Sequence, residues 1–391
     1  TIPRVASLLP TGTIPATCAA WHDALMGGRV RLADWSVTIG TLPRGRTNSV
    51  LDVPGVGLGH ATVISDQAEP PAGTGIARTG VTVLDPGGDA WASPVPAGVS
   101  ILNGAGELTG RTQIDEWGLA ETPVFLTSTM QVGRVYDAAC RLLIDEQPRI
   151  GVDDVVIPIV GECDDSWLTD TRRMHVQYDD VASALAAARR SVGGALASGD
   201  VGLGAVGAGT GMCCFSWKGG IGSASRLLPD GHVIGVLVLA NFGWWDRLTI
   251  AGVAVGRELG PPPHVAPPPA GSCLGVVITD ARIDAAGCAR LAARMGLGLA
   301  RTGSTAHHAS GEIFLGLATG LRGLRTDRSS PVRSTAAISG TGLDPYFEAT
   351  VDATEEAVID ALLGATTTTG VGGKTIEALP LDRVRTILGV Q

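Results

Sequence analysis

The chain has 391 residues, of which 45% are hydrophobic and only 17% are charged. This composition, with 55 glycines in no collagen-like period, is typical of a compact and heavily buried protein. The formal charge of −9 argues against a nucleic-acid partner, because nucleic-acid binding requires a clustered basic surface. The length allows one large domain or two ordinary ones.

The sequence indicates neither a membrane protein nor a disulfide-rich secreted protein. No apolar stretch reaches the roughly eighteen uncharged residues of a membrane span, and the N-terminus lacks the regions of a signal peptide. The cysteines are odd in number and include no CxxC pair, which argues against a disulfide framework and a zinc site: Cys18, Cys140, Cys163, Cys213, Cys214, Cys273 and Cys288. We expect a soluble, cytoplasmic protein.

The strands are predicted from apolar runs. Residues 1–47 carry no regular pattern and are predicted to form an irregular arm, so that the ordered part starts at Asn48. A buried strand is predicted at 155–162. The segments 232–241 (HVIGVLVLAN) and 274–279 (LGVVIT) have the continuous, β-branched apolar character of strands covered on both faces.

Three helices are predicted from apolar residues at helical spacing. They cover 181–197; 283–300, with Asp284 as the N-cap; and 352–364, with Asp352 and Glu355 as a capping box and Gly364 at the end. Helices that alternate with strands predict sheets packed against helix layers.

The segment GLGAVGAGTG (202–211) contains the GxGxxG pattern of dinucleotide-binding sites. That pattern binds a nucleotide when a strand precedes it and a helix follows it. Here a predicted helix precedes it and an extended segment follows, so we interpret it as a glycine-rich hairpin or as the backbone lining of a pocket.

The segment AGSCLGVV (270–277) begins a buried strand directly after the proline-rich connector PPPHVAPPP. The Gly271–Ser272 step is either an ordinary turn before the strand or a self-cleavage site. A serine at a new N-terminus has its own base, because its α-amino group has a pKa near 8. An attack of the Ser272 hydroxyl on the Gly271 carbonyl would shift the acyl group from nitrogen to oxygen, and glycine allows the strained backbone that this attack requires.

Seven ordered sequence blocks carry a resemblance to a known family. From Asn48 to the C-terminus, the chain resembles the self-processing DmpA and β-peptidyl aminopeptidase family of N-terminal-nucleophile-type hydrolases. The matching blocks are LDVPGVGLGHATVI, LNGAGELTG, IPIVGECDDSWLTD, GAGTGMCCFSWKGGIGSASR, VLVLANFGWWDRLTIAGVAVG, GSCLGVVITDA and HHASGEIFLGLATG.

The resemblance implies Ser272 as the nucleophile that follows the cut. The neighbouring Cys273 is the competing candidate, because a thiol is the better intrinsic nucleophile. The spacing from Ser272 to Thr279 and Asp280 fits the family pattern, and Cys273 is then a small core residue of the strand.

The family's second serine and its acid correspond to Ser310 and Glu312 in the block HHASGEIF. Residues two apart on a strand share a face, so both side chains can approach one nucleophile. Glu312 would orient Ser310, which would hold or relay the α-amino proton of Ser272. His307 and His308 suggest a Ser–His pair, which we discount because adjacent residues on an extended segment face opposite ways.

Two further residues are implied near the reacting atoms. Asn241 matches the family's oxyanion-hole asparagine, whose amide donates to the developing negative oxygen at a gain of about 3 kcal/mol. Lys218, in WKGGIG, either adds positive charge near the site or is an ordinary surface lysine.

The substrate-binding residues keep one family feature and lose others. Glu162 matches an acid suited to hold the free amino group of a substrate, which favours an aminopeptidase. Cys163 and Asp164 stand where Thr-Tyr is usual, and Met130 and Gln131 stand where His-Ser is common. We therefore expect intact catalytic chemistry and altered specificity.

This divergence leaves other activities open. Nylon-oligomer hydrolases and the amidase that trims pantetheine side chains in carbapenem biosynthesis share the implied fold and self-cleavage. High Ala, Gly and Arg usage is typical of a GC-rich bacterial genome and suits such a specialised role. A non-catalytic binding protein that never matures is a separate alternative.

The resemblance implies an α+β fold, a four-layer αββα sandwich of the N-terminal-nucleophile-hydrolase type with DmpA and ornithine acetyltransferase topology. Residues 48–391 would form one domain, cut into an α chain of 1–271 and a β chain of 272–391 that stay associated. The family forms homo-oligomers of such heterodimers, with tetramers favoured, and needs no cofactor. Its substrates are small peptides or amides.

Overall fold

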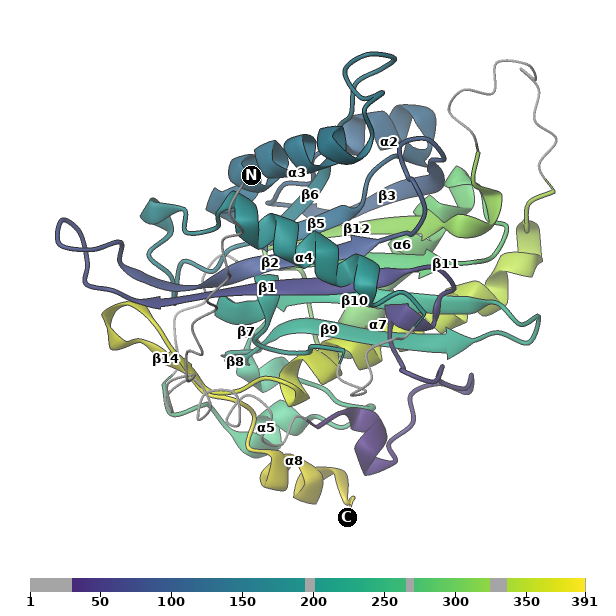
Figure 1. Ribbon diagram of the computed structural model, residues 1–391. Helices are drawn as coiled ribbons and strands as arrows, with labels where there is room; N and C mark the ends of the chain where they lie inside the picture. The colour runs from purple at the N-terminus through teal and green to yellow at the C-terminus, as the bar shows by residue number, and fades with distance from the viewer. Residues whose placement is uncertain (1–29, 194–200, 265–270, 324–335, 391) are drawn as a thin grey trace, which may run out of the picture.

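Two β-sheets stacked face to face form the centre of the protein (Figure 1). The computed structural model describes residues 30–193, 201–264, 271–323 and 336–390. The smaller sheet has the order β1-β2-β5-β6, and the larger has the order β4-β3-β12-β11-β10-β9. The strands are β1 Gly57–Asp66, β2 Ile76–Asp85, β3 Val95–Gly104, β4 Leu119–Ala120, β5 Val124–Ser128, β6 Ile159–Cys163, β9 Gly220–Leu227, β10 Val233–Asn241, β11 Ser272–Thr279 and β12 Gly311–Ala318.

Helices cover the outer face of each sheet, which completes the four-layer αββα sandwich expected from the sequence. Helices α3 and α4 pack on the smaller sheet, and α6 and α7 pack on the larger one. The helices are α2 Arg111–Trp117, α3 Val132–Glu146, α4 Tyr178–Arg190, α5 Val255–Leu259, α6 Ala285–Arg301, α7 Asp344–Leu363 and α8 Leu381–Leu388. Short strand pairs complete the fold: β7 Cys213–Cys214 with β8 Trp217–Lys218, and β13 Thr368–Thr369 with β14 Thr375–Ile376.

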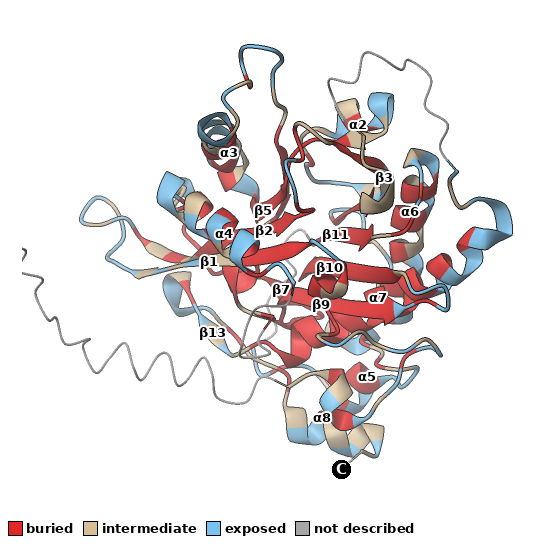
Figure 2. Ribbon diagram, turned by 45° about the vertical axis from the view of Figure 1, so that its right-hand side comes forward, coloured by how far each residue is buried: buried red, intermediate tan, exposed pale blue. Residues whose placement is uncertain are grey.

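The hydrophobic core lies in the layers between these elements (Figure 2). Leu126 of the smaller sheet and Leu274 of the larger belong to the layer between the sheets. Val277 and Met295 belong to the layer between the larger sheet and its helices. Close approach of α7 requires a glycine at 222, because a Cβ there would lie 1.8 Å from the Ala357 carbonyl oxygen. Among the described residues, no helix is long and apolar enough to cross a bilayer.

Several predicted elements are confirmed. β10 and β11 follow the segments predicted at 232–241 and 274–279. Helix α6 has Asp284 as its N-cap, whose side chain accepts a 2.8 Å hydrogen bond from the Gly287 amide.

Other predicted bounds were wrong. Strand β6 begins only at Ile159, and α4 ends at Arg190, while residues 194–197 of the predicted helix lie outside the described residues. Helix α7 begins at Asp344, eight residues before the predicted start, with proline in its first turn. The supposed capping residues Asp352 and Glu355 lie inside α7, where both pair with Arg301. The acids that the sequence suggested as a capping box therefore serve long-range ion pairs with Arg301 instead.

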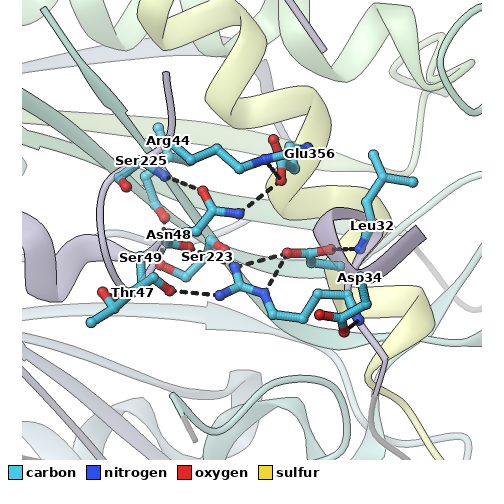
Figure 3. A network of polar contacts seen from close by, with 12 residues as sticks. Leu32, Asp34, Arg44, Thr47, Asn48, Ser49, Ser223, Ser225 and Glu356 are labelled. Atoms are coloured by element: carbon cyan, nitrogen blue, oxygen red, sulfur yellow. Dashed lines mark hydrogen bonds and ion pairs between the residues drawn. The ribbon is translucent and has the colours of Figure 1, made fainter. Parts of the chain in front are cut away.

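The segment 30–47 has one short 3-10 helix and packs on the core. Its short 3-10 helix, Leu32–Trp35, buries both end residues against the α7 layer. Buried and part-buried polar contacts attach this segment and the adjoining Asn48 to α7 and β9 (Figure 3). They join Arg31 to Asp360, Arg44 and Asn48 to Glu356, and Asn48 to Ser225. The ordered part therefore starts before Asn48, while residues 1–29 of the predicted arm lie outside the described residues.

Candidate active site

Three neighbouring strands bring the predicted catalytic residues together at one end of the larger sheet. Ser272 is the first residue of β11 and lies opposite Asn241, the last residue of the antiparallel strand β10. On the other side it lies beside Gly311, the first residue of the parallel strand β12. Ser310 directly precedes this strand and Glu312 follows within it. The register of the sheet therefore assembles the site.

The side chain of Asn241 is oriented by its hydrogen bonds. Its Oδ1 accepts from the Cys213 amide at 2.8 Å, and its Nδ2 donates to the Asp164 carbonyl at 2.9 Å. The same Nδ2 approaches the Ser272 Oγ at 3.4 Å. Because the amide oxygen is occupied by a donor, the NH2 group faces the serine, as an oxyanion donor must.

Ser310 and Glu312 are both buried and are joined by a short hydrogen bond from the Ser310 hydroxyl to the carboxylate. Burial raises the pKa of Glu312, while hydrogen bonds from Ser310 and Asn103 act in the opposite direction. Since the Ser310 hydroxyl donates its hydrogen bond to Glu312, its lone pairs remain free to accept from another group.

Asn103 is a site residue that the sequence analysis did not identify. It lies opposite Glu312 in the β3–β12 pair, beside a bulge between Glu312 and Ile313. Its Nδ2 donates to the His307 carbonyl at 2.7 Å, and the Ser310 amide donates to the same oxygen at 2.8 Å. Its position in the block LNGAGELTG was the available signal.

The Gly271–Ser272 bond lies among these groups. The Gly271 carbonyl oxygen accepts a 3.0 Å hydrogen bond from the Gly311 amide. A Cβ on Gly271 would lie 3.0 Å from the Ser310 Oγ, so a side chain at 271 would crowd that hydroxyl. Most of the proline-rich connector, at 265–270, lies outside the described residues.

Two cysteines flank the nucleophile on opposite faces of the sheet. Cys273 belongs to the core between the larger sheet and its helices, whereas Leu274 belongs to the core between the two sheets. The Cys273 thiol thus points away from the face that Ser272 shares with Leu274. Cys163 lies on that face, in contact with Ser272, and burial raises the pKa of both thiols. Neither is an activated thiolate.

Glu162 is a buried carboxylate held by neutral donors. Its Oε1 accepts from the Glu107 amide at 2.9 Å, and its Oε2 accepts a short hydrogen bond from the Thr129 hydroxyl. Burial raises its pKa, and the carboxylates of Asp164 and Glu107 add to this shift. Among the residues described, no cation pairs with it. Thr129 was not identified from the sequence.

The residues that depart from the family pattern differ in exposure. Asp164 is partly exposed, and its carboxylate accepts from the amide and hydroxyl of Ser166. The Met130 side chain is largely exposed, whereas Gln131 is fully buried and its amide atoms have no hydrogen-bond partner. Of these residues, Asp164 and Met130 are accessible to solvent, whereas Gln131 is not.

Lys218 is not a surface lysine. Its side chain is fully buried, and its Nζ donates to the carbonyls of Gly209, Met212 and Gly219 at 3.0, 2.8 and 2.9 Å. Burial lowers its pKa to about 7, whereas the three converging carbonyl acceptors favour the charged ammonium, which has one N–H bond for each of them. The glycine-rich segment 202–211 supplies one of these carbonyls, that of Gly209, and ends in the 3-10 turn Gly207–Gly211.

His307 and His308 are exposed, and the His307 ring contacts Thr305 at 3.1 Å. The histidine contributes its backbone oxygen to the site, through the bonds from Asn103 and Ser310. No group of three His, Cys, Asp or Glu within the described ranges could hold a metal.

The chain is similar in sequence and in structure to known aminopeptidases. The model of peptidase family S58 matches residues 48–376. The β-peptidyl aminopeptidase BapA of Sphingosinicella microcystinivorans is 36% identical over 362 residues, 88% of each chain. A Burkholderia β-aminopeptidase structure matches with a TM-score of 0.82 at 36% identity, covering 92% of this chain and 98% of that one. The L-aminopeptidase D-Ala-esterase/amidase of Ochrobactrum anthropi, a variant of the Ntn hydrolase fold, has a TM-score of 0.83, 33% identity and the same coverage.

Proposed function

The chain belongs to peptidase family S58, and from this premise we propose that it is a self-cleaving aminopeptidase whose nucleophile is Ser272. The observation that carries the proposal is the position of Ser272 at the start of β11, between the Asn241 amide and the Ser310–Glu312 pair. Each of these groups has a part in the chemistry.

The first reaction is the cut that exposes the nucleophile. The Ser272 Oγ attacks the Gly271 carbonyl carbon, and the Gly311 amide donates to the oxygen that becomes negative. The C–N bond then breaks, the nitrogen keeps its electron pair and takes the proton that the hydroxyl lost, and an ester joins Gly271 to the Ser272 Oγ. Water hydrolyses this ester, which leaves a carboxyl on Gly271 and a free amine and hydroxyl on Ser272.

The second reaction is hydrolysis of a substrate. The free α-amino group of Ser272 accepts the Oγ proton as the oxygen attacks the substrate carbonyl, and Asn241 donates to the oxyanion. The amine leaves with that proton, and water hydrolyses the acyl-enzyme. Ser310 accepts a hydrogen bond from the α-amino group because its own proton is directed to Glu312.

The substrate is proposed to carry a free N-terminal amine. Glu162 is a buried carboxylate satisfied by neutral donors alone, so an incoming ammonium would provide its charge partner. Short peptides and amides, including those with an N-terminal β-amino acid, fit this requirement. The relatives reported above are named as aminopeptidases, which favours this activity over nylon-oligomer or pantetheine hydrolysis and over a non-catalytic binding protein.

The remaining expectations stand as proposals from the family resemblance. After the cut, the α and β chains stay associated because each contributes strands to the larger sheet. The heterodimers assemble into homo-oligomers, with the tetramer favoured. The protein acts in the cytoplasm without a cofactor.

Intact mass under denaturing conditions tests the nucleophile. We expect two fragments that meet at the Gly271–Ser272 bond, no cut in Ser272→Ala, and a normal cut in Cys273→Ala. A single uncut wild-type chain, or a cut that depends on Cys273 alone, would contradict the proposal. For the substrate, N-acetylation of an aminoacyl para-nitroanilide should remove most of the activity, and equal rates for free and blocked amines would exclude the role of Glu162.

A further inference from the structure

A lysine is unusual in this chain. The sequence contains 27 arginines and only two lysines, Lys218 and Lys374. Lys374 is exposed and lies over the Trp167 ring, whereas Lys218 is fully buried. Within the part of the chain that the structure describes, Lys218 forms no ion pair, and its partners are the three backbone carbonyls.

The geometry of these carbonyls explains the choice of residue. Three acceptors surround one nitrogen at 2.8 to 3.0 Å, which uses all three N–H bonds of an ammonium group. An arginine has a flat fork of donors and does not fit acceptors that converge on one point. Because every N–H bond is directed to a carbonyl, Lys218 is not a general base for Ser272.

One of the three carbonyls connects Lys218 to the catalytic asparagine. The Met212 carbonyl and the Cys213 amide belong to the same peptide group. The Lys218 Nζ donates to the Met212 oxygen of this peptide group at 2.8 Å. The Cys213 N–H of the same group donates to the Asn241 Oδ1 at 2.8 Å. The Asn241 Nδ2 then faces the Ser272 Oγ at 3.4 Å. A continuous chain of hydrogen bonds thus runs from the buried ammonium to the nucleophile.

The charge and the position of Lys218 act in the same direction along this chain. An ammonium at a peptide oxygen polarises the group and strengthens its N–H as a donor, and chains of hydrogen bonds in a dry interior reinforce one another. The bonds to Gly209 and Gly219 hold the same loop from both sides, so the Cys213 amide cannot turn away from Asn241.

We propose that Lys218 is a positioning residue for the oxyanion hole, which it orients and polarises through the Met212–Cys213 peptide group and Asn241. The inference rests on the proposed role of Asn241 as the oxyanion donor. It assigns Lys218 a part in transition-state stabilisation without contact with the substrate.

The experiment is a double-mutant cycle between Lys218→Met and Asn241→Ala. Turnover of a β-alanine para-nitroanilide is normalised to the amount of cleaved chain, which is measured by intact mass. We expect Lys218→Met to lower kcat on the order of tenfold with little change in KM, because a charge-assisted bond is lost from a group that acts in the transition state. Lys374→Met is the matched control and should keep wild-type turnover.

The double variant distinguishes positioning from a general structural effect. If Lys218 acts through Asn241, Lys218→Met lowers kcat no further in the Asn241→Ala background. If the two losses in kcat multiply in the double variant, the inference about Lys218 is wrong, while the proposed oxyanion role of Asn241 stands. An unchanged rate for Asn241→Ala would remove the proposed oxyanion role and the inference with it. The same cycle with Lys218→Gln serves if the methionine variant does not fold, and failure of both to fold would make Lys218 a requirement of the fold rather than of the site.

Discussion

Two buried polar regions of this protein are built on different rules. In the network that attaches residues 30–47 to α7, arginines meet carboxylates: Arg31 pairs with Asp360, and Arg44 pairs with Glu356 (Figure 3). Arg226 of β9 pairs with the same Glu356 carboxylate. At the candidate active site, the described acids Glu162 and Glu312 accept only from hydroxyl, amide and backbone donors. The site's one lysine likewise meets neutral carbonyls.

The difference separates charges that hold the fold from charges that are available for chemistry. A buried ion pair satisfies both partners, and removal of one leaves the other unpaired at a high cost in stability. A buried acid with neutral donors has a raised pKa and no fixed counter-charge, so it can bind a cation or exchange a proton. The ion pairs of Asp360 and Glu356 involve α7, whereas Glu312 lies at the start of β12 and Glu162 near the end of β6.

The largest expected effect is the loss of turnover in Glu312→Gln. Glutamine still accepts a hydrogen bond from Ser310 but lacks the charge that directs the serine proton, so we expect kcat to fall on the order of a thousandfold. The stability of the variant should not fall, because removal of a buried charge lowers the desolvation cost. Steady-state kinetics measures the effect on kcat, and thermal unfolding measures the effect on stability. A large drop in Tm with unchanged kcat would place Glu312 among the structural acids.

The opposite split is expected for Glu356→Gln. Arg226 and Arg44 both lose their carboxylate, so we expect the free energy of unfolding to fall by about 3 kcal/mol. Turnover per folded molecule should stay at the wild-type value. Urea unfolding of the whole chain, in the Ser272→Ala background, measures the first quantity. Equal free energies of unfolding for Glu356→Gln and its Ser272→Ala parent would show that this network does not stabilise the fold.

A smaller effect is expected for Asn103→Ala. The variant loses the bond to the His307 carbonyl and a donor that opposes the raised pKa of Glu312. We expect kcat to fall by about tenfold, the usual scale for loss of a hydrogen bond to a charged group. The acidic limb of the pH–rate profile should move to higher pH. A profile that keeps its wild-type midpoint would separate Asn103 from Glu312.

An effect of a different kind is expected in how stability depends on pH. Burial raises the pKa of Asp165 from 3.8 to about 7, so between these values the folded state binds more protons than the unfolded state. Stability therefore falls as the pH rises through this window, by up to about 1.4 kcal/mol per pH unit. Asp165→Asn should lose that slope, whereas Asp115→Asn, at an exposed position on α2, should keep it. Parallel slopes for all three proteins would contradict the assignment.

The sequence predicted the parts of the fold that depend on local pattern. Strands β10 and β11 and the N-cap Asp284 follow from apolar runs and short-range hydrogen bonds. The start of α7 did not follow, because the ion pairs of Asp352 and Glu355 join residues about fifty positions apart. Nor did the packing of residues 30–47, whose partners lie on α7, some three hundred positions away.

The candidate site shows the same division. The resemblance named Ser272, Asn241, Ser310 and Glu312, and the sheet register places them together. The environment of Lys218 could not be predicted, because its partners are backbone carbonyls, which every residue type has. Asn103 meets Glu312 through pairing between distant strands, which a sequence pattern does not encode.

The strand order has a consequence for the life history of the molecule. In the larger sheet, β11 and β12 lie between β10 on one side and β3 on the other. After a cut before Ser272, two strands of the C-terminal fragment would therefore lie between strands of the N-terminal fragment in one sheet. Folding of the intact chain is unimolecular, but reassembly of the denatured fragments would require two chains to meet, at a rate that depends on concentration. Maturation of this kind would be irreversible in practice: the protein would fold as one uncut chain, and its two fragments would refold together only poorly after denaturation.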